Sequence, residues 1–290
     1  MALTLTALHR YPVKSCRGEA VTHAAVEPWG LAADRRWMLV DDAGAAITAR
    51  EVNAMLLLRP EITEAGLRLH AAGSAGRAPL DVPLPDPAVQ VPISLWGSHL
   101  TAAPTGRDAA AWVSDVLGVS ARLVWLDDPA RRPTDPAFTS AEDRVSLADG
   151  YPLLLASEES LAALNDQVLA SGGPAAAALP MTRFRPNVVV RGAAAWTEDD
   201  WRRIRIGEAT FRAVKGCARC VLTTIDPDTA ERGKEPIASL ARLRRWDNKT
   251  WFGINLQPDG DGTPAGRPRI SVGDEVEVLD AVAPGGGPLR

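Results

Sequence analysis

Residues 215–229 read KGCARCVLTTIDPDT, which places two cysteines three positions apart, directly before an apolar run. The run 221–225 is rich in β-branched residues, so it predicts a strand immediately after the cysteine pair. A thioredoxin-like dithiol opens a helix instead, and the predicted strand argues against that motif. A zinc site would need further ligands, for which the candidates are Cys16, His9, His23, His70 and His99. Both interpretations stay open, together with the simpler one of buried thiols packed on a strand.

Short strand-forming runs surround this segment in the second half of the chain. We expect strands at 187–191, 201–206, 209–215, 251–256 and 275–279. An apolar run at 152–155 leads into Ser157-Glu158-Glu159, where a hydroxyl and two carboxylates suit the start of a helix that continues to about Leu169. A second helix is predicted near 236–245.

The first half of the chain has the pattern of a β-meander followed by one helix. Apolar runs at 37–40, 45–48 and 67–70 are separated by turn signals at 42–44 and 64–66. The pattern then predicts a helix at 108–117 that ends at Gly118, a strand at 122–126 and a Pro-, Arg- and Asp-rich connection at 127–149. Strands outnumber helices and do not alternate with them, which argues against a doubly wound parallel sheet. The predicted fold class is α+β and mainly β, a β-barrel architecture with peripheral helices.

Composition indicates in which compartment the protein is expected and which partners it is expected not to bind. The formal net charge of −4 provides no long-range attraction to nucleic acid or to an anionic membrane. No apolar run reaches the roughly 20 residues of a membrane helix, and the chain begins with an alternating, strand-like segment instead of a signal peptide. Three cysteines are too few for a disulfide framework, so a reducing compartment is expected. We therefore predict a cytoplasmic protein that binds neither nucleic acid nor a membrane.

The cysteine pair also suits a third kind of chemistry. A single thiolate can hold a soft, high-valent metal when an organic cofactor supplies the other ligands. Arg219 stands next to Cys220 in the sequence, and its charge is expected to favour ionisation of that thiol. An anionic cofactor would also need cationic and N–H partners. For this purpose the chain offers Lys14-Ser15, Arg35, Arg185-Pro186-Asn187 and Arg219.

Six motifs, in the same order, resemble one protein family along nearly the whole chain. They are Tyr11-Pro12-Val13-Lys14-Ser15-Cys16-Arg17-Gly18, Asp34-Arg35-Arg36-Trp37, Thr48-Ala49-Arg50, Phe184-Arg185-Pro186-Asn187, Cys217-Ala218-Arg219-Cys220 with Thr223-Thr224-Ile225-Asp226-Pro227-Asp228, and Val272-Gly273-Asp274. The chain resembles the MOSC-domain proteins, specifically the mitochondrial amidoxime-reducing component and its bacterial relatives.

The resemblance implies a domain organisation and a cofactor site. It implies an N-terminal MOSC-associated β-barrel domain at 1–126, a linker or long loop at 127–149, a β-barrel MOSC domain with peripheral helices at 150–282 and a flexible tail at 283–290. A molybdenum-pyranopterin cofactor is expected between the two domains, with Cys220 as the metal ligand and catalytic residue. The implied cofactor-binding residues are Lys14, Ser15, Arg35, Gly150, Tyr151, Arg185, Asn187, Ala218, Arg219 and Cys220.

Two departures from the family pattern affect this site. Gly150-Tyr151 stands where the animal members carry Thr-Ser, and Ala218 stands where they carry Ser. Hydroxyl contacts are therefore lost or replaced by backbone groups at these positions.

The resemblance also implies an activity. The expected reaction is the reduction of small N-hydroxylated compounds such as amidoximes, hydroxylamines and N-hydroxy bases. The alternative is a protein without this activity, which carries the cofactor or holds sulfur as a persulfide on Cys220. No dinucleotide-binding glycine motif is present and three cysteines cannot hold a four-cysteine iron–sulfur cluster, so a separate haem or iron–sulfur donor with its reductase is expected, and a pyridine nucleotide would act only indirectly. No carboxylate or histidine stands out in the sequence as a proton donor.

Overall fold

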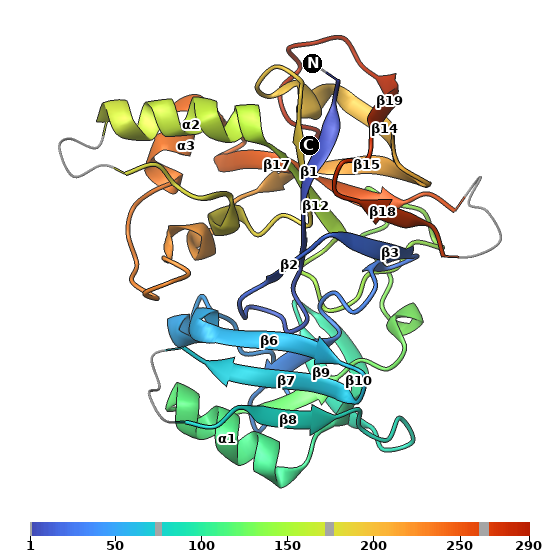
Figure 1. The fold of residues 1–290 in the computed structure, drawn as a ribbon, viewed down its shortest axis with the longest axis vertical. Helices are drawn as coiled ribbons and strands as arrows, with labels where there is room; N and C mark the ends of the chain where they lie inside the picture. The colour runs from blue at the N-terminus through green and yellow to red at the C-terminus, as the bar shows by residue number, and fades with distance from the viewer. Residues whose placement is uncertain (1, 73–76, 172–176, 261–266) are drawn as a thin grey trace.

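β-Strands dominate the protein. The computed structural model describes residues 2–72, 77–171, 177–260 and 267–290. Within them the α-helices are α1 (Arg107–Leu117), α2 (Glu158–Ser171) and α3 (Ile237–Leu243). Figure 1 shows two lobes, one containing α1 and the other containing α2 and α3. The predicted mainly β, α+β fold class is confirmed. No helix in the described ranges is long and apolar enough to cross a membrane.

The lobe with α2 and α3 is built on a nine-stranded sheet. Its strand order is β19-β14-β15-β17-β12-β13-β1-β2, with β16 paired to β17 at the side. β12 and β13 are parallel, because α2 lies between them in the chain, whereas the other pairings in this sheet are antiparallel. The bounds are β1 (Thr4–Arg10), β2 (Glu19–Val21), β12 (Leu153–Ser157), β13 (Val188–Arg191), β14 (Trp201–Ile206), β15 (Ala209–Ala218), β16 (Arg245–Trp246), β17 (Lys249–Pro258) and β19 (Val276–Ala281).

The core of this lobe follows from alternation along the strands. In β14 and β15, alternate side chains such as Ile204, Ile206 and Phe211 are fully buried, and they pack against Leu155 and Ile254 of the neighbouring strands. A smaller sheet, β18-β3-β4, lies beside it, with β3 (His23–Glu27), β4 (Gly30–Leu31) and β18 (Arg269–Ser271).

The lobe with α1 contains two further sheets. One has the order β5-β11-β10-β9 and the other β6-β7-β8. The strands are β5 (Trp37–Val40), β6 (Leu58–Thr63), β7 (Gly66–Ala71), β8 (Leu80–Pro83), β9 (Val91–Leu95), β10 (Ser98–Pro104) and β11 (Arg122–Trp125). Helix α1 buries Val113 and Leu117 against this core and ends at Gly118, as predicted, and the φ of 70° at Gly118 is the left-handed conformation typical of a helix end.

The first strand of the chain lies in the sheet of the second half. β1 pairs antiparallel with β13, and Leu8 faces Val188. The segment that follows β1 therefore meets the segment that precedes β13. The end of the chain, predicted as a tail, also contacts this sheet, since the Gly216 N–H donates to the Leu289 carbonyl at 2.6 Å. The predicted domain boundaries remain predictions.

Two predicted strands are wrong. Residues 221–225 do not form a strand, because η6 (Val221–Thr224) is a 3₁₀ turn that begins after Cys220. The Thr223 hydroxyl donates to the Cys220 carbonyl at 3.0 Å and the Thr224 hydroxyl donates to the Val221 carbonyl at 2.8 Å, so side chains stabilise a turn that β propensity disfavours. At 45–48, Ala45 and Ala46 make only isolated bridges. The other 3₁₀ helices include η1 (Asn53–Leu57), η2 (Pro129–Arg131), η4 (Met181–Phe184) and η5 (Thr197–Asp200).

A buried carboxylic acid is present in η5. Glu198 is 1% exposed, and burial outweighs the interactions with Ser160 and Arg244 that favour its charged form. Burial raises the pKa of Glu198 from its ordinary value of 4.5 to about 7. The neighbouring Asp199 is instead paired with Arg244. Glu198 is therefore a point of pH-dependent instability in this lobe.

We predict that Glu198→Gln stabilises the protein at alkaline pH. The folded state binds the Glu198 proton more tightly than the unfolded state, so this stabilisation is complete below about pH 4.5 and is lost as pH rises through about 7. At pH 8 the neutral amide should raise the free energy of unfolding by about 1–3 kcal/mol, with little change at pH 4.5, as measured by urea unfolding. Exposed Glu64→Gln is the control, and an equal effect of Glu198→Gln at both pH values would contradict the assignment.

Candidate functional site

The structure brings all ten sequence-predicted site residues together at one open cavity. The described residues that line it and were predicted are Lys14, Ser15, Arg35, Gly150, Tyr151, Arg185, Asn187, Ala218, Arg219 and Cys220. Further lining residues, which the prediction did not include, are Arg50, Ala148, Asp149, Leu153, Leu154, Phe184, Cys217, Leu222 and Asn255.

Strand pairing explains this convergence. Lys14 and Ser15 follow β1, whereas Arg185 and Asn187 precede β13, and antiparallel pairing brings these two ends of the strands together. The segment 148–151 leads into β12, which runs parallel to β13 and therefore starts at the same edge of the sheet. Cys220 arrives from the end of β15.

Three of the lining residues have strained backbones. Ser15, Arg35 and Arg185 have φ angles of 68°, 47° and 55°, in the left-handed region that non-glycine residues rarely adopt. Each such conformation costs roughly 1 kcal/mol or more. Surrounding hydrogen bonds stabilise it, for example the one from the Arg35 N–H to the Tyr11 carbonyl at 2.7 Å. Strain of this kind clusters at functional sites.

A buried network orients Arg35. Its guanidinium donates to Asp34 Oδ2 at 2.6 Å and to Asn187 Oδ1 at 2.8 Å. Asn187 is completely buried, and its amide nitrogen donates to Asp34 Oδ1 at 3.1 Å and to the His9 carbonyl at 3.1 Å. Since the Asn187 amide is fully engaged within the protein, its role in this arrangement is to hold Arg35.

Two arginines share the ring of Tyr11. The guanidinium carbons of Arg35 and Arg185 lie 4.5 and 4.3 Å from the ring centroid. Burial raises the pKa of Tyr11 to about 12, although both arginines oppose this shift. The phenol therefore stays neutral at physiological pH, and its hydroxyl donates to the Pro186 carbonyl at 3.1 Å.

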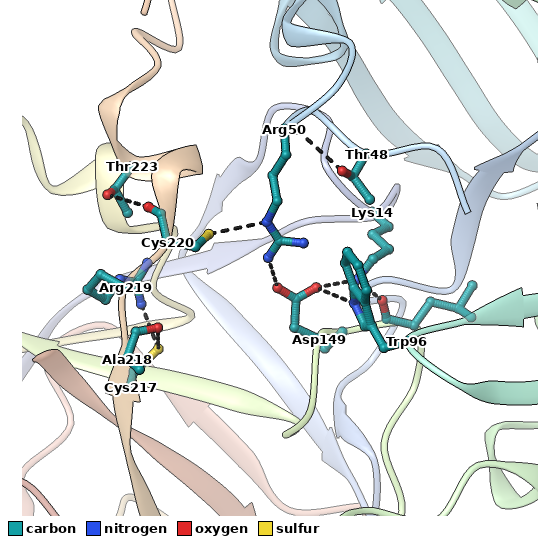
Figure 2. A network of polar contacts seen from close by, with 12 residues as sticks. Lys14, Thr48, Arg50, Trp96, Asp149, Cys217, Ala218, Arg219, Cys220 and Thr223 are labelled. Carbon is teal, nitrogen blue, oxygen red and sulfur yellow. Dashed lines mark hydrogen bonds and ion pairs between the residues drawn. The ribbon is translucent and has the colours of Figure 1, made fainter. Parts of the chain in front are cut away.

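An ion network links the cavity wall to Cys220 (Figure 2). Lys14 Nζ donates to Asp149 Oδ1 at 2.5 Å and to the Leu147 carbonyl at 2.9 Å. Arg50 donates through Nη2 to Asp149 Oδ2 at 2.6 Å and through Nε to Cys220 Sγ at 3.3 Å. Burial lowers the pKa of Lys14 to about 8, although the charge of Asp149 opposes the shift. Burial opposes ionisation of Asp149, but Lys14 and Arg50 outweigh it and hold its pKa well below the usual range.

The two cysteines of the pair have different arginine partners. Arg219 was expected to act on Cys220, and this expectation is wrong: its Nη1 donates to Cys217 Sγ at 2.7 Å and its Nη2 to the Phe184 carbonyl at 2.7 Å. Cys217 is still part of β15, whereas Cys220 lies after the strand, directly before the 3₁₀ turn η6. Arg219 is next to Cys220 in the sequence, but its guanidinium contacts Cys217. Burial raises the pKa of Cys217 despite Arg219.

The zinc interpretation finds no ligand set in the described ranges. No group of three or more His, Cys, Asp or Glu side chains that could hold a metal ion occurs there. Cys16 is completely buried, and burial raises its pKa to about 12. All three cysteines are free thiols.

The donor set of the cavity suits an anionic group that also binds a soft metal. Five cationic side chains, Lys14, Arg35, Arg50, Arg185 and Arg219, line the described part of the cavity, against one carboxylate, Asp149. Arg219 Nε is a buried donor without a partner. Phosphate and pterin oxygens accept hydrogen bonds from such donors, and Cys220 provides a thiol beside them. The residues present therefore fit a phosphorylated pterin cofactor with a metal.

Comparison with known protein families identifies the class of protein to which the chain belongs. Residues 2–120 match the MOSC N-terminal beta barrel domain, and residues 142–277 match the MOSC domain. The chain belongs to the MOSC family.

Among its relatives are proteins named for amidoxime reduction. The chain is 33% identical to mitochondrial amidoxime-reducing component 1 of Mus musculus, over 95% of this chain and 82% of the mouse protein. It is 30% identical to the Homo sapiens protein of the same name, over 95% of this chain and 83% of the human protein. A molybdenum cofactor sulfurase of Oryza sativa subsp. japonica is also 30% identical, over 84% of this chain but 31% of that longer protein.

The lowered pKa of Lys14 predicts that anion binding in the cavity weakens above pH 8. Lys14 loses its charge as pH rises through about 8, whereas Arg35 and Arg50 nearby, whose pKa values are raised by their acidic neighbours, stay charged. The dissociation constant of the protein without cofactor for sulfate, an anion of constant charge in this range, should rise several-fold between pH 7 and pH 9.5. Calorimetric titration measures it. Lys14→Arg should remove most of this pH dependence, and a steep rise that persists in this variant would assign the titration to another group.

Proposed function

We propose that this chain is a molybdenum-cofactor-dependent reductase of N-hydroxylated compounds, in which Cys220 ligates the metal. The observation that carries the proposal is the position of the Cys220 thiol beside a cavity lined by five cationic side chains. The names of the mouse and human relatives support amidoximes as a substrate class, with hydroxylamines and N-hydroxy bases as chemically similar compounds.

The cationic residues would hold the anionic part of the cofactor. Lys14, Arg35, Arg185 and Arg219 are the donors for phosphate and pterin oxygens, and Asn187 keeps Arg35 in position. At Ser15, Gly150, Tyr151 and Ala218 the backbone is the part of the residue that we expect to contact the cofactor. Gly150 has no side chain to cover its backbone, and the space beside it is open, since a Cβ built there would meet none of the surrounding atoms within 4 Å.

The bound cofactor would supply the redox chemistry that breaks the N–O bond, by which an amidoxime, two electrons and two protons become an amidine and water. The chain's own contribution concerns orientation and proton supply. Asp149 stays ionised, so it serves as an acceptor that holds Lys14 and Arg50. Lys14 Nζ, with its pKa of about 8, is a group in the cavity lining that can release a proton near neutral pH.

Electrons would come from a separate protein with a haem or an iron–sulfur cluster. Four arginines and a lysine line the described part of the cavity, whereas the sequence has no glycine-rich nucleotide motif. The three free thiols are consistent with a reducing compartment, for which we keep the cytoplasm as the proposal.

A second candidate is a carrier of the cofactor or of a persulfide on Cys220, which the similarity to a molybdenum cofactor sulfurase favours. Metal and pterin analysis of the purified protein, followed by an assay of amidoxime reduction with a chemical reductant, separates the two. Metal with turnover supports the reductase, metal without turnover supports the cofactor carrier, and a protein that is purified without metal and binds none supports the persulfide function.

We predict that Cys220→Ser abolishes activity and depletes molybdenum, because an alcohol is a harder and less acidic ligand than a thiolate. Cys217→Ser is the matched control, since Cys217 is held by Arg219 on β15. It should retain most of the metal and activity. Metal analysis and the amidoxime assay provide the two measurements, and equal losses in both variants would disprove a single-cysteine ligand.

We also predict that the purified chain does not sustain amidoxime reduction with NADH or NADPH alone. Turnover should appear with a chemical reductant or after addition of a haem or iron–sulfur donor and its reductase. The assay compares these conditions at the same protein concentration. Sustained NADH-dependent turnover by the pure chain would reveal an internal redox group and refute the need for a separate donor.

A further inference from the structure

A tryptophan occupies an unusual position at the tip of the β9–β10 hairpin. Leu95 pairs with Ser98, so Trp96 and Gly97 alone form the turn. Their φ angles are 50° and 83°, the conformation of a type I′ turn, which favours Asn-Gly. A bulky residue at positive φ is strained. The Trp96 side chain is also 54% exposed, so neither turn preference nor burial in the core explains a tryptophan here.

The indole of Trp96 contacts the ion network of the cavity through a hydrogen bond and two cation–π contacts (Figure 2). Trp96 Nε1 donates to Asp149 Oδ1 at 3.1 Å. Its ring centroid lies 4.7 Å from the Arg50 guanidinium carbon and 5.8 Å from Lys14 Nζ. Asp149 lines the cavity, and Arg50 connects it to Cys220. The ring is therefore held at the rim of the site, one hydrogen-bonded residue away from the arginine that contacts the thiol.

The indole contacts Arg50 and Lys14 beside the cavity, and since Trp96 is 54% exposed, part of its flat apolar surface stays open to solvent there. Aromatic rings bind planar conjugated groups by offset stacking, and this interaction is stronger than the contact with a small alkyl group. Because the ring is already fixed by Asp149 and Arg50, little conformational freedom is lost when a ligand stacks on it.

We propose that Trp96 determines substrate specificity by stacking on the planar, conjugated part of an N-hydroxylated substrate. Aryl amidoximes and N-hydroxylated bases belong to this class, whereas small aliphatic amidoximes do not. The inference rests on the proposed function and adds to it the residue that selects the aromatic and conjugated members of the substrate class.

The test compares benzamidoxime with acetamidoxime, which share the reacting group and differ in the ring. Trp96→Asn removes the indole and places Asn-Gly in the turn, so the hairpin remains well formed. With equal metal occupancy and a chemical reductant, the ratio of kcat/KM for benzamidoxime to that for acetamidoxime should fall about tenfold, mainly through KM. Trp96→Phe, which keeps a ring but loses the Nε1 donor, should retain most of this ratio. Val89→Asn, at a side chain that is also 54% exposed, is the control and should leave the ratio unchanged.

An unchanged ratio in Trp96→Asn overturns the inference. An equal loss for both substrates also overturns it, since the indole would then act only by holding Asp149. A loss that appears only with a protein electron donor would instead assign Trp96 to a docking surface.

Calorimetric binding of benzamidoxime to the metal-loaded wild type and to Trp96→Asn decides the question without turnover. If the wild type reduces neither amidoxime, the proposed function fails. In that case about tenfold weaker binding of benzamidoxime to the variant still supports stacking on Trp96, and equal binding refutes it.

Discussion

The antiparallel pairing of β1 with β13 is the constraint on which the site depends. Thr4–Arg10 and Val188–Arg191 are far apart in the chain, and their ladder joins the first strand to the sheet of the second half. Because Leu8 lies opposite Val188, the chain that leaves β1 passes beside the chain that enters β13. A shift of one residue in this register would turn the side chains of β1 to the other face of the sheet and remove Leu5 and Leu8 from the core. The same hydrophobic pattern that stabilises the lobe therefore also positions the cavity.

Crowding of like charges is the main energetic problem of such a site. Arg35 and Arg185 approach the same phenol ring, and burial lowers the pKa of Arg185 while Asp34 and other neighbours keep Arg35 charged. Asp149 compensates Lys14 and Arg50. Each carboxylate offsets part of the desolvation of its cations, but the lining keeps a positive excess. An anionic group that enters the cavity completes the charge balance.

The two thiols of the cysteine pair have different arginine partners because they lie in different backbone elements. Cys217 is still part of β15, where Arg219 reaches it, whereas Cys220 lies at the start of η6, where Arg50 reaches it from the other lobe. Through Arg50, the hairpin with Trp96 and the strand end with Cys220 share one polar network. Residues from five separated parts of the chain, Lys14, Arg50, Trp96, Asp149 and Cys220, thus meet within it.

The sequence by itself determined the class of fold and ten of the residues that line the cavity. Alternation of apolar residues indicated β14 and β15, Gly118 marked the end of α1, and the ordered motifs identified ten residues that line the cavity. These features are local or are carried by residue identity, so they can be recognised without coordinates.

Only the tertiary structure decided which side chains are partners. Arg50 belongs to the Thr48-Ala49-Arg50 motif and Asp149 directly precedes Gly150, yet neither was predicted as a site residue. Arg50 contacts Cys220, 170 residues away, and Asp149 contacts Lys14, 135 residues away, and the sequence does not show such distant contacts. The same holds for Arg219, whose guanidinium turned to Cys217, and for 221–225, where hydroxyl–carbonyl hydrogen bonds overcame β propensity. The local sequence pattern indicates which secondary structure a residue prefers, whereas strand register and burial decide which distant group its side chain contacts.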